Sequence, residues 1–157
     1  MIKNILVALD DGDTCQSVFN RAIELAQPLH AKLNLVSVLM PERDDSLTQA
    51  PYSDADWKTY ADRYRDLQTA GFRMLESLTA KAQEAGISAA FTQAVGSPGP
   101  AICELARTWS TDLILVGSHG RKGLSEMLLG SVSNYVVHHA TCSVMVVHQP
   151  DWANAEI

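Results

Sequence analysis

Short apolar runs alternate with longer segments of helical periodicity along the chain. The runs rich enough in Ile, Leu and Val to form buried strands are residues 3–10, 32–40, 87–95, 112–117 and 143–149. Between them, residues 14–30, 55–84, 97–109 and 131–140 repeat apolar positions at spacings of three and four. Strands that alternate with helices in this way predict an α/β fold, a five-stranded parallel sheet with helices on both faces.

The pattern contains one break without strand or helix character. Residues 41–56 hold two prolines and four aspartates, which predicts a mobile loop. Residues 150–157 read as a frayed tail. No internal repeat or second apolar core is visible, so residues 1–157 are predicted to form one domain.

The long central helix carries an aromatic stripe. Trp57, Tyr60 and Tyr64 recur at helical spacing, and such a stripe usually belongs to the core, which is the interpretation favoured here. Gly71 interrupts the pattern and would allow a bend, while Gly86 is well placed to end the helix.

Composition narrows the classes of function. The chain has 157 residues and a formal net charge of -6, so it gains little from counterion release and is not expected to bind nucleic acid. No apolar run reaches the roughly 18 residues of a membrane span, and the N-terminal run is too short for a secretory signal. We therefore expect a cytoplasmic protein without a membrane segment. Cys15, Cys103 and Cys142 lack metal-site spacing and are predicted to be buried free thiols.

Candidate chemistry lies where strands end. The stretch GSHGRKGLSEMLLGSVS (residues 117–133) follows the fourth apolar run and opens the last helix. Gly117 and Gly120 would allow a sharp turn and close ligand approach, and Gly130-Ser131 would present unpaired helix amides to an anion. Ligands in parallel sheets bind at the carboxyl ends of strands, which brings Asp10 into the same crevice. The arrangement suits a phosphate group, with Asp10 available for ribose hydroxyls.

A simpler interpretation stays open from these residues alone. The glycines would then be ordinary loop residues, and Ser131 would be only a helix cap. The motif GxxxxGK[ST] is absent, and no GxGxxG follows a strand, which argues against a P-loop protein.

The spacing Gly117-x2-Gly120-x9-Gly130-Ser131 resembles the G-x2-G-x9-G-[S/T] signature of nucleotide-binding universal stress proteins. The segments ILVALD, DLILVGSHG, LLGSVS and SVMVV extend the resemblance over essentially the whole chain. It implies a Rossmann-like sheet, similar to that of the adenine nucleotide alpha hydrolases, which binds ATP or a related nucleotide such as ADP, AMP or cyclic AMP. Mg²⁺ would accompany the phosphates, without a separate protein metal site.

The resemblance also implies a set of binding residues. Asp10 would bind ribose, and Val38 and Val116 would border the adenine. Gly117 and Gly120 would pass close to the ribose and phosphates, and residues 130–133 would hold the phosphates through backbone amides and hydroxyls. The full set is Ala8, Leu9, Asp10, Val38, Val116, Gly117, Gly120, Gly130, Ser131, Val132 and Ser133. Val38 depends on its place at a strand end and not on a motif.

The expected function is that of a nucleotide-responsive stress or regulatory protein with unidentified protein partners. No GxSxG elbow or catalytic set is visible, so catalytic residues are not expected. A slow ATP hydrolase and a nucleotide-independent interaction module are the alternatives. Family members commonly pair their last strands, and the run from Ser143 to Gln149 fits such a homodimer.

Several polar residues near these segments have ambiguous roles. His138 and His139 are adjacent and point in different directions on a helix, so we expect them to interact with the helix end rather than with a metal. His119 is expected to stabilise the glycine loop. Arg121 and Lys122 either reach a terminal phosphate or are solvated cations, and the sequence favours neither.

Overall fold

The computed structural model describes residues 1–41, 53–118 and 129–149. It confirms the predicted α/β fold. The elements in chain order are β1 (Asn4–Ala8), α1 (Cys15–Leu29), β2 (Lys32–Leu39), α2 (Asp54–Glu84), β3 (Ala89–Val95), α3 (Pro98–Thr108), β4 (Leu113–Gly117), α4 (Ser131–His139) and β5 (Ser143–Val147). Each predicted strand and helix forms, with ends that shift by a few residues.

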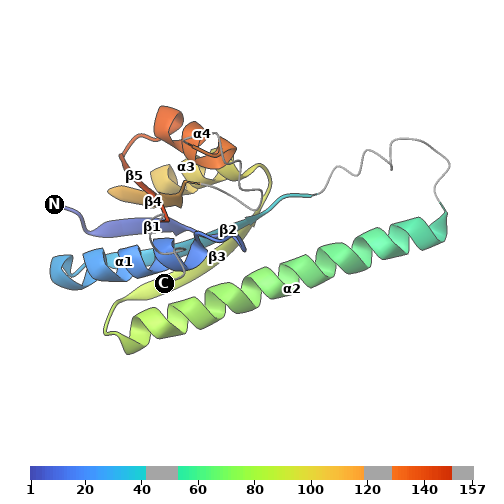
Figure 1. Ribbon diagram of the computed structural model, residues 1–157, viewed down its shortest axis with the longest axis horizontal. Coiled ribbons are helices and arrows are strands. Elements are labelled where there is room, and N and C mark those ends of the chain that lie inside the picture. The colour runs from blue at the N-terminus through green and yellow to red at the C-terminus, as the bar shows by residue number, and fades with distance from the viewer. Residues whose placement is uncertain (42–52, 119–128, 150–157) are drawn as a thin grey trace, which may run out of the picture.

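The strands form one parallel sheet in the order β3-β2-β1-β4-β5. From the central β1 the chain adds β2 and then β3 on one side. It then crosses back and adds β4 and β5 on the other side. Figure 1 shows α1 and α2 on one face of the sheet and α3 and α4 on the other. The connections reverse direction between β1 and β4, which is where open parallel sheets form ligand crevices.

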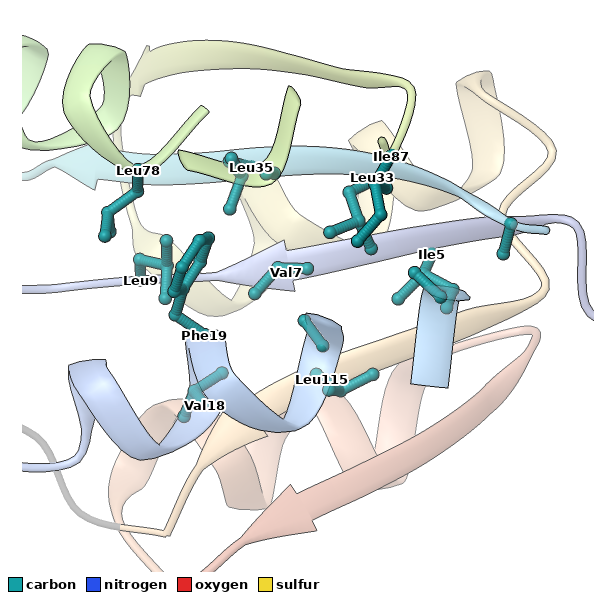
Figure 2. Close-up of a cluster of buried hydrophobic side chains, with 14 of the residues drawn as sticks. Ile5, Val7, Leu9, Val18, Phe19, Leu33, Leu35, Leu78, Ile87 and Leu115 are labelled. Carbon is teal, nitrogen blue, oxygen red and sulfur yellow. The ribbon is translucent and has the colours of Figure 1, made fainter. Parts of the chain in front are cut away.

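The core has two layers, one on each face of the sheet. Strand residues alternate between them: Ile5 and Val7 pack with α1 and α2, whereas Leu6 packs with α3 and α4. All three are fully buried. Figure 2 shows the first layer, in which Val18 and Phe19 of α1 approach the strand side chains. The near-continuous apolar runs in the sequence follow from this burial on both faces.

Helix α2 begins earlier than predicted. Ser53 caps it: the Ser53 hydroxyl accepts from the Asp56 amide at 3.2 Å, and Asp56 Oδ2 accepts from the Ser53 amide at 3.1 Å. This capping box makes residues 54–56 helical, so the end of the predicted 41–56 loop is wrong. The central part of that loop and the predicted tail at 150–157 lie outside the described residues.

Gly71 within α2 and Gly86 beyond its end have different structural roles. The helix runs unbroken through Gly71, whose missing side chain gives room to Gln93 of β3; an added Cβ would lie 2.7 Å from Gln93 Nε2. Gly86 has φ of +80° just beyond the helix end, as the predicted stop requires.

The aromatic stripe of α2 is not core, which corrects the sequence interpretation. The buried residues of this helix all lie in its second half: Leu75, Leu78, Thr79 and Ala82. Trp57 is 52% exposed. The helical period is present, but the sheet is shorter than the helix, so the same face is covered in one half and uncovered in the other.

Two further expectations from the sequence concern membrane-spanning helices and the cysteines. No helix in residues 1–41, 53–118 and 129–149 is long and apolar enough to cross a membrane. The three cysteines are free thiols, as predicted, but each is half-buried instead of fully buried.

Candidate functional site

An open cavity lies at the carboxyl end of the sheet, where the helices that follow β1 and β4 lie on opposite faces (Figure 1). The space between its walls, with the open solvent at its mouth included, is about 690 Å³. Its walls come from the ends of β1, β2 and β4 and from the first turns of α1, α3 and α4. The lining residues are Ala8, Leu9, Asp10, Thr14, Cys15, Val18, Val36, Val38, Pro98, Ile102, Val116, Gly117, Gly130, Ser131, Val132 and Ser133.

Every proposed binding residue that the structure describes lines this cavity. Val38, which the sequence placed only by its position at a strand end, lines it as well. Gly120 lies outside the described residues, as do His119, Arg121 and Lys122. The structure thus brings together residues that are more than a hundred positions apart in the chain.

A backbone hydrogen bond joins the two ends of the glycine-rich stretch. The Gly130 amide donates to the Ser118 carbonyl at 2.6 Å, and the Ser118 amide donates to the Val147 carbonyl at 2.9 Å. Ser118 is 1% exposed. The exit of β4 and the entry to α4 are therefore fixed side by side, which holds the start of α4 at the cavity.

The residues at the start of α4 differ in what they offer a ligand. Gly130 is the N-cap, so Ser131 is the first helical residue and not the cap. Ser131 is exposed at the cavity, whereas Ser133 is buried. The Ser133 hydroxyl donates to the Gly130 carbonyl at 3.1 Å, so its proton is used within the turn. The backbone amides of this turn and the Ser131 hydroxyl are the donors that best suit an anion.

Three helices begin at the cavity. Neither Thr14 nor Ser97 makes a side-chain capping hydrogen bond, and the N-cap Gly130 has no side chain to make one. Helix α2 begins elsewhere and has a complete capping box. Pro98 and Pro100 leave the first turn of α3 with few amide donors, so the partial positive charge and unpaired amides at the start of α4 are what best suit a negatively charged group.

Asp10 lines the cavity just after β1. Its Oδ1 accepts from the Gly12 amide at 2.8 Å, which folds the chain back toward α1. The carboxylate is exposed and held by this turn. A carboxylate in this place is suited to accept hydrogen bonds from hydroxyl groups.

Gly117 is needed for packing beneath the cavity. A Cβ at this position would overlap the Thr14 hydroxyl and lie 3.4 Å from Val18 Cγ2. The missing side chain therefore lets β4 approach the first turn of α1. This role differs from the ligand approach that the sequence suggested.

Cys15 lines the cavity as a protonated thiol. Burial raises its pKa to about 11, and the charges of Asp10 and Asp11 add to the effect. Its Sγ lies 3.9 Å from Met74 Sδ of α2. At neutral pH the thiol is therefore a poor nucleophile.

Sequence reasoning missed part of the wall. Thr14, Cys15 and Val18 follow β1 on the first turn of α1, and Pro98 and Ile102 begin α3. The Ser97-Pro98 helix start was recognisable, and helices that follow parallel strands begin at their carboxyl ends, so this signal could have placed α3 at the cavity.

The described residues contain no group of three or more His, Cys, Asp or Glu side chains able to hold a metal ion. His139 belongs to the last turn of α4, where its Nδ1 lies 2.8 Å from the Tyr135 carbonyl and its ring stacks on Tyr135. This contact agrees with the helix-end role expected for His139.

Comparison with known sequences identifies relatives over nearly the full chain. A family model described as "Universal stress protein family" matches residues 1–148. Universal stress protein Sll1388 of Synechocystis is 36% identical over 148 residues, which cover 91% of this chain and 96% of that protein. Universal stress protein YxiE of Bacillus subtilis is 34% identical over 150 residues, 94% of this chain and 99% of that protein.

Solved structures share the fold. The hypothetical protein MJ0577 matches with a TM-score of 0.82 at 23% identity, over 96% of this chain and 99% of that one. A universal stress protein in complex with cAMP has a TM-score of 0.68 at 24% identity, over 95% and 98%. A family protein from Arabidopsis thaliana with AMP bound has a TM-score of 0.69 at 20% identity, over 98% and 96%.

Proposed function

The chain belongs to the universal stress protein family, and from this premise we propose that it binds ATP or a related adenine nucleotide as a nucleotide-responsive regulatory protein. The observation that carries the proposal is the cavity. It brings an exposed carboxylate, apolar strand ends and the start of α4 together around one space. The relatives solved with cAMP and with AMP support an adenine nucleotide as the ligand.

The chemistry of the walls assigns a part of the nucleotide to each side. Val38 and Val116 offer an apolar surface to the flat base, and Asp10 faces the ribose hydroxyls. The amides at the start of α4 and the Ser131 hydroxyl hold the phosphates. Mg²⁺ that accompanies the phosphates would bind through phosphate oxygens and water.

A direct test is an inventory of what the purified protein carries. Protein isolated without harsh washing is denatured, and its supernatant is examined by mass spectrometry for ATP, ADP, AMP and cyclic AMP. The proposal predicts one of them in an amount that scales with protein. An empty supernatant, followed by no heat on titration with any of the four, would refute it.

We further propose that binding, and not turnover, is the function. The described lining residues include no His, Lys or Arg that would act as a general acid or stabilise a leaving phosphate, and the one thiol, Cys15, stays protonated. Phosphate release from ATP should therefore be the same for the wild type and for Asp10→Ala. Release that tracks protein concentration and disappears in Asp10→Ala would favour the hydrolase.

We also propose that the protein is a homodimer paired through β5. This strand lies at the edge of the sheet. The Val147 carbonyl points toward β4, where it accepts from Ser118, so the backbone groups of Val146, one residue earlier, point away from the sheet. These outward groups are what a second β5 would pair with.

Val146→Pro should abolish this dimer, because proline removes one outward amide without altering the β4 ladder. Val146→Thr keeps both the amide and the branched shape, and should sediment as the wild type does. If the wild type and Val146→Pro have the same sedimentation coefficient over a wide concentration range, pairing through β5 is wrong. The cytoplasmic location and the protein partners stay predictions from the sequence.

A further inference from the structure

The first half of α2 projects beyond the rest of the molecule. Helix α2 is 31 residues long, and its first buried residue is Leu75. Figure 1 shows the half nearer Asp54 continuing past the sheet while the other half lies along it. The capping box at Ser53 keeps the projecting end helical, so whatever surface it carries is already ordered.

The projecting half carries the aromatic stripe, defined as Trp57, Tyr60 and Tyr64. The Trp57 and Tyr60 rings meet edge to face with centroids 6.5 Å apart, and Tyr60 and Tyr64 stack at 6.4 Å. Trp57 is 52% exposed, and both tyrosines are partly exposed. Three large, partly exposed aromatic side chains on one helix face are typical of an interaction surface.

The same half of α2 has acidic residues at one end and basic residues at the other, so two antiparallel copies would place opposite charges side by side. Asp54 and Asp56 lie in the first turn, and Arg63 and Arg65 lie about two turns later. Asp56 and Arg63 are seven residues apart, so they flank the stripe on the same side. Arg65 already lies 3.9 Å from Asp62 of its own helix, an exposed pair that contributes little.

We propose that this surface binds a second copy of itself, with the two projecting halves antiparallel about a two-fold axis between Thr59 and Tyr60. Asp56 then lies level with the partner's Arg63, and Asp54 with the partner's Arg65. The midpoint between Asp56 and Arg63 is also the midpoint between Asp54 and Arg65. One antiparallel register therefore brings both charge pairs together, and the two-fold axis generates each pair twice.

The same register interleaves the aromatic rings. Tyr60 lies beside the axis next to its own symmetry mate, and Trp57 lies level with the gap between Tyr60 and Tyr64 of the partner subunit. Because Trp57 is 52% exposed and both tyrosines are less exposed, covering six such rings of about 150–250 Å² each buries on the order of 500 Å² of new surface, which is below the size of a stable interface. The association is therefore expected to be reversible.

This interface is separate from β5. Helix α2 packs against β3 and β2, whereas β5 forms the opposite edge of the sheet. Pairing through α2 would therefore join molecules, or dimers already paired through β5, at their far ends. A protein that uses both surfaces would form assemblies larger than two.

Sedimentation velocity over a range of concentrations tests the proposal through a charge swap. Asp54→Arg and Arg65→Asp each place like charges opposite one another, and each should weaken the association about tenfold. The double variant restores opposite charges and should return to near the wild-type value. Asp54 and Arg65 are used because they leave the capping box intact, and circular dichroism checks helix content.

Matched controls separate this surface from others. Glu76→Arg reverses an exposed charge in the sheet-covered half of α2 and should leave association unchanged. Trp57→Ala should remove the association without altering the melting temperature, because Trp57 lies outside both core clusters. A double variant that stays as weak as the single ones overturns the proposal. The proposal is also overturned if the wild type does not self-associate but binds phosphatidylserine vesicles, and Trp57→Ala abolishes that vesicle binding.

Discussion

Gly117 shows how a residue in a functional motif is explained by its neighbours in the fold. Its sequence context suggested room for a ligand, yet its missing side chain points at the first turn of α1. A Cβ would overlap the Thr14 hydroxyl and lie 3.1 Å from Thr14 Cβ. Because Thr14 is 4% exposed, it has little room to move away.

Gly117→Ala should therefore lower the free energy of unfolding by about 1–3 kcal/mol even without nucleotide. Thr14→Ala removes the atom that the new side chain would overlap, so the double variant should recover part of this loss. Urea denaturation of the four proteins measures the coupling. If Gly117→Ala is as stable as the wild type and impaired only in nucleotide binding, the packing explanation is wrong.

Cys15 provides a test of the electrostatics inside the cavity. Burial, and then the charges of Asp10 and Asp11, raise its pKa from 9.0 to about 11. Each pKa unit removes about nine-tenths of the thiolate at pH 8, and the greater nucleophilicity of the remainder offsets part of that loss. Alkylation should be roughly tenfold slower than that of an ordinary peptide thiol.

The measurement is the iodoacetamide rate for Cys15 with Cys103 and Cys142 both changed to Ser. The rate should keep rising above pH 9, since the thiol titrates near pH 11 and is neutral below it. Asp10→Asn should raise the rate only modestly, because burial is the largest cause. A rate that levels off near pH 9 would contradict the assignment.

At the scale of elements, α3 and α4 depend on one close contact. A Cβ on Gly99 would lie 2.6 Å from Tyr135 Cδ1 and 2.7 Å from Tyr135 Cγ. Both helices begin at the cavity, so their separation sets the distance between two of its walls. Gly99→Ala should destabilise the protein by about 1–3 kcal/mol, although alanine favours a helix over glycine by about 1 kcal/mol.

Tyr135→Ala removes the two nearest atoms and provides the matched background. In that background Gly99→Ala should lower the stability much less. The overlap with the Tyr135 ring is gone, and the higher helix propensity of alanine remains. Thermal denaturation of the single and double variants measures the difference. Equal losses in both backgrounds would show that Tyr135 is not the obstacle.

Elements also show what sequence patterns can and cannot predict. Apolar runs predicted all five strands, because strands buried on both faces need little else. Helical period predicted α2, but a period describes which residues share a face and not whether anything covers it. The aromatic stripe was therefore assigned to the core, and only the length of the sheet relative to α2 corrects this.

At the scale of the molecule, the sequence predicted some of the residues that line the cavity but not all of them. Asp10 and Gly130 were identified because strand ends and glycine spacing are local signals. Cys15, Val36 and Ile102 were missed because they reach the cavity through tertiary packing of α1, β2 and α3. A helix start such as Ser97-Pro98 was visible but was not related to the site.

The central claim is that the cavity binds an adenine nucleotide at the start of α4. Gly130 has φ of -71° and ψ of 169°, which valine also adopts, so Gly130→Val adds bulk at the cavity without backbone strain. Ser88→Val places the same side chain at an exposed position far from it along the chain.

Calorimetric titration of ATP, ADP, AMP and cyclic AMP into the three proteins, freed of bound ligand, is the most direct measurement. The wild type and Ser88→Val should bind at least one nucleotide with equal affinity, and Gly130→Val should lose at least tenfold while keeping its circular dichroism spectrum. Equal binding by Gly130→Val, or no binding by the wild type, would contradict the account.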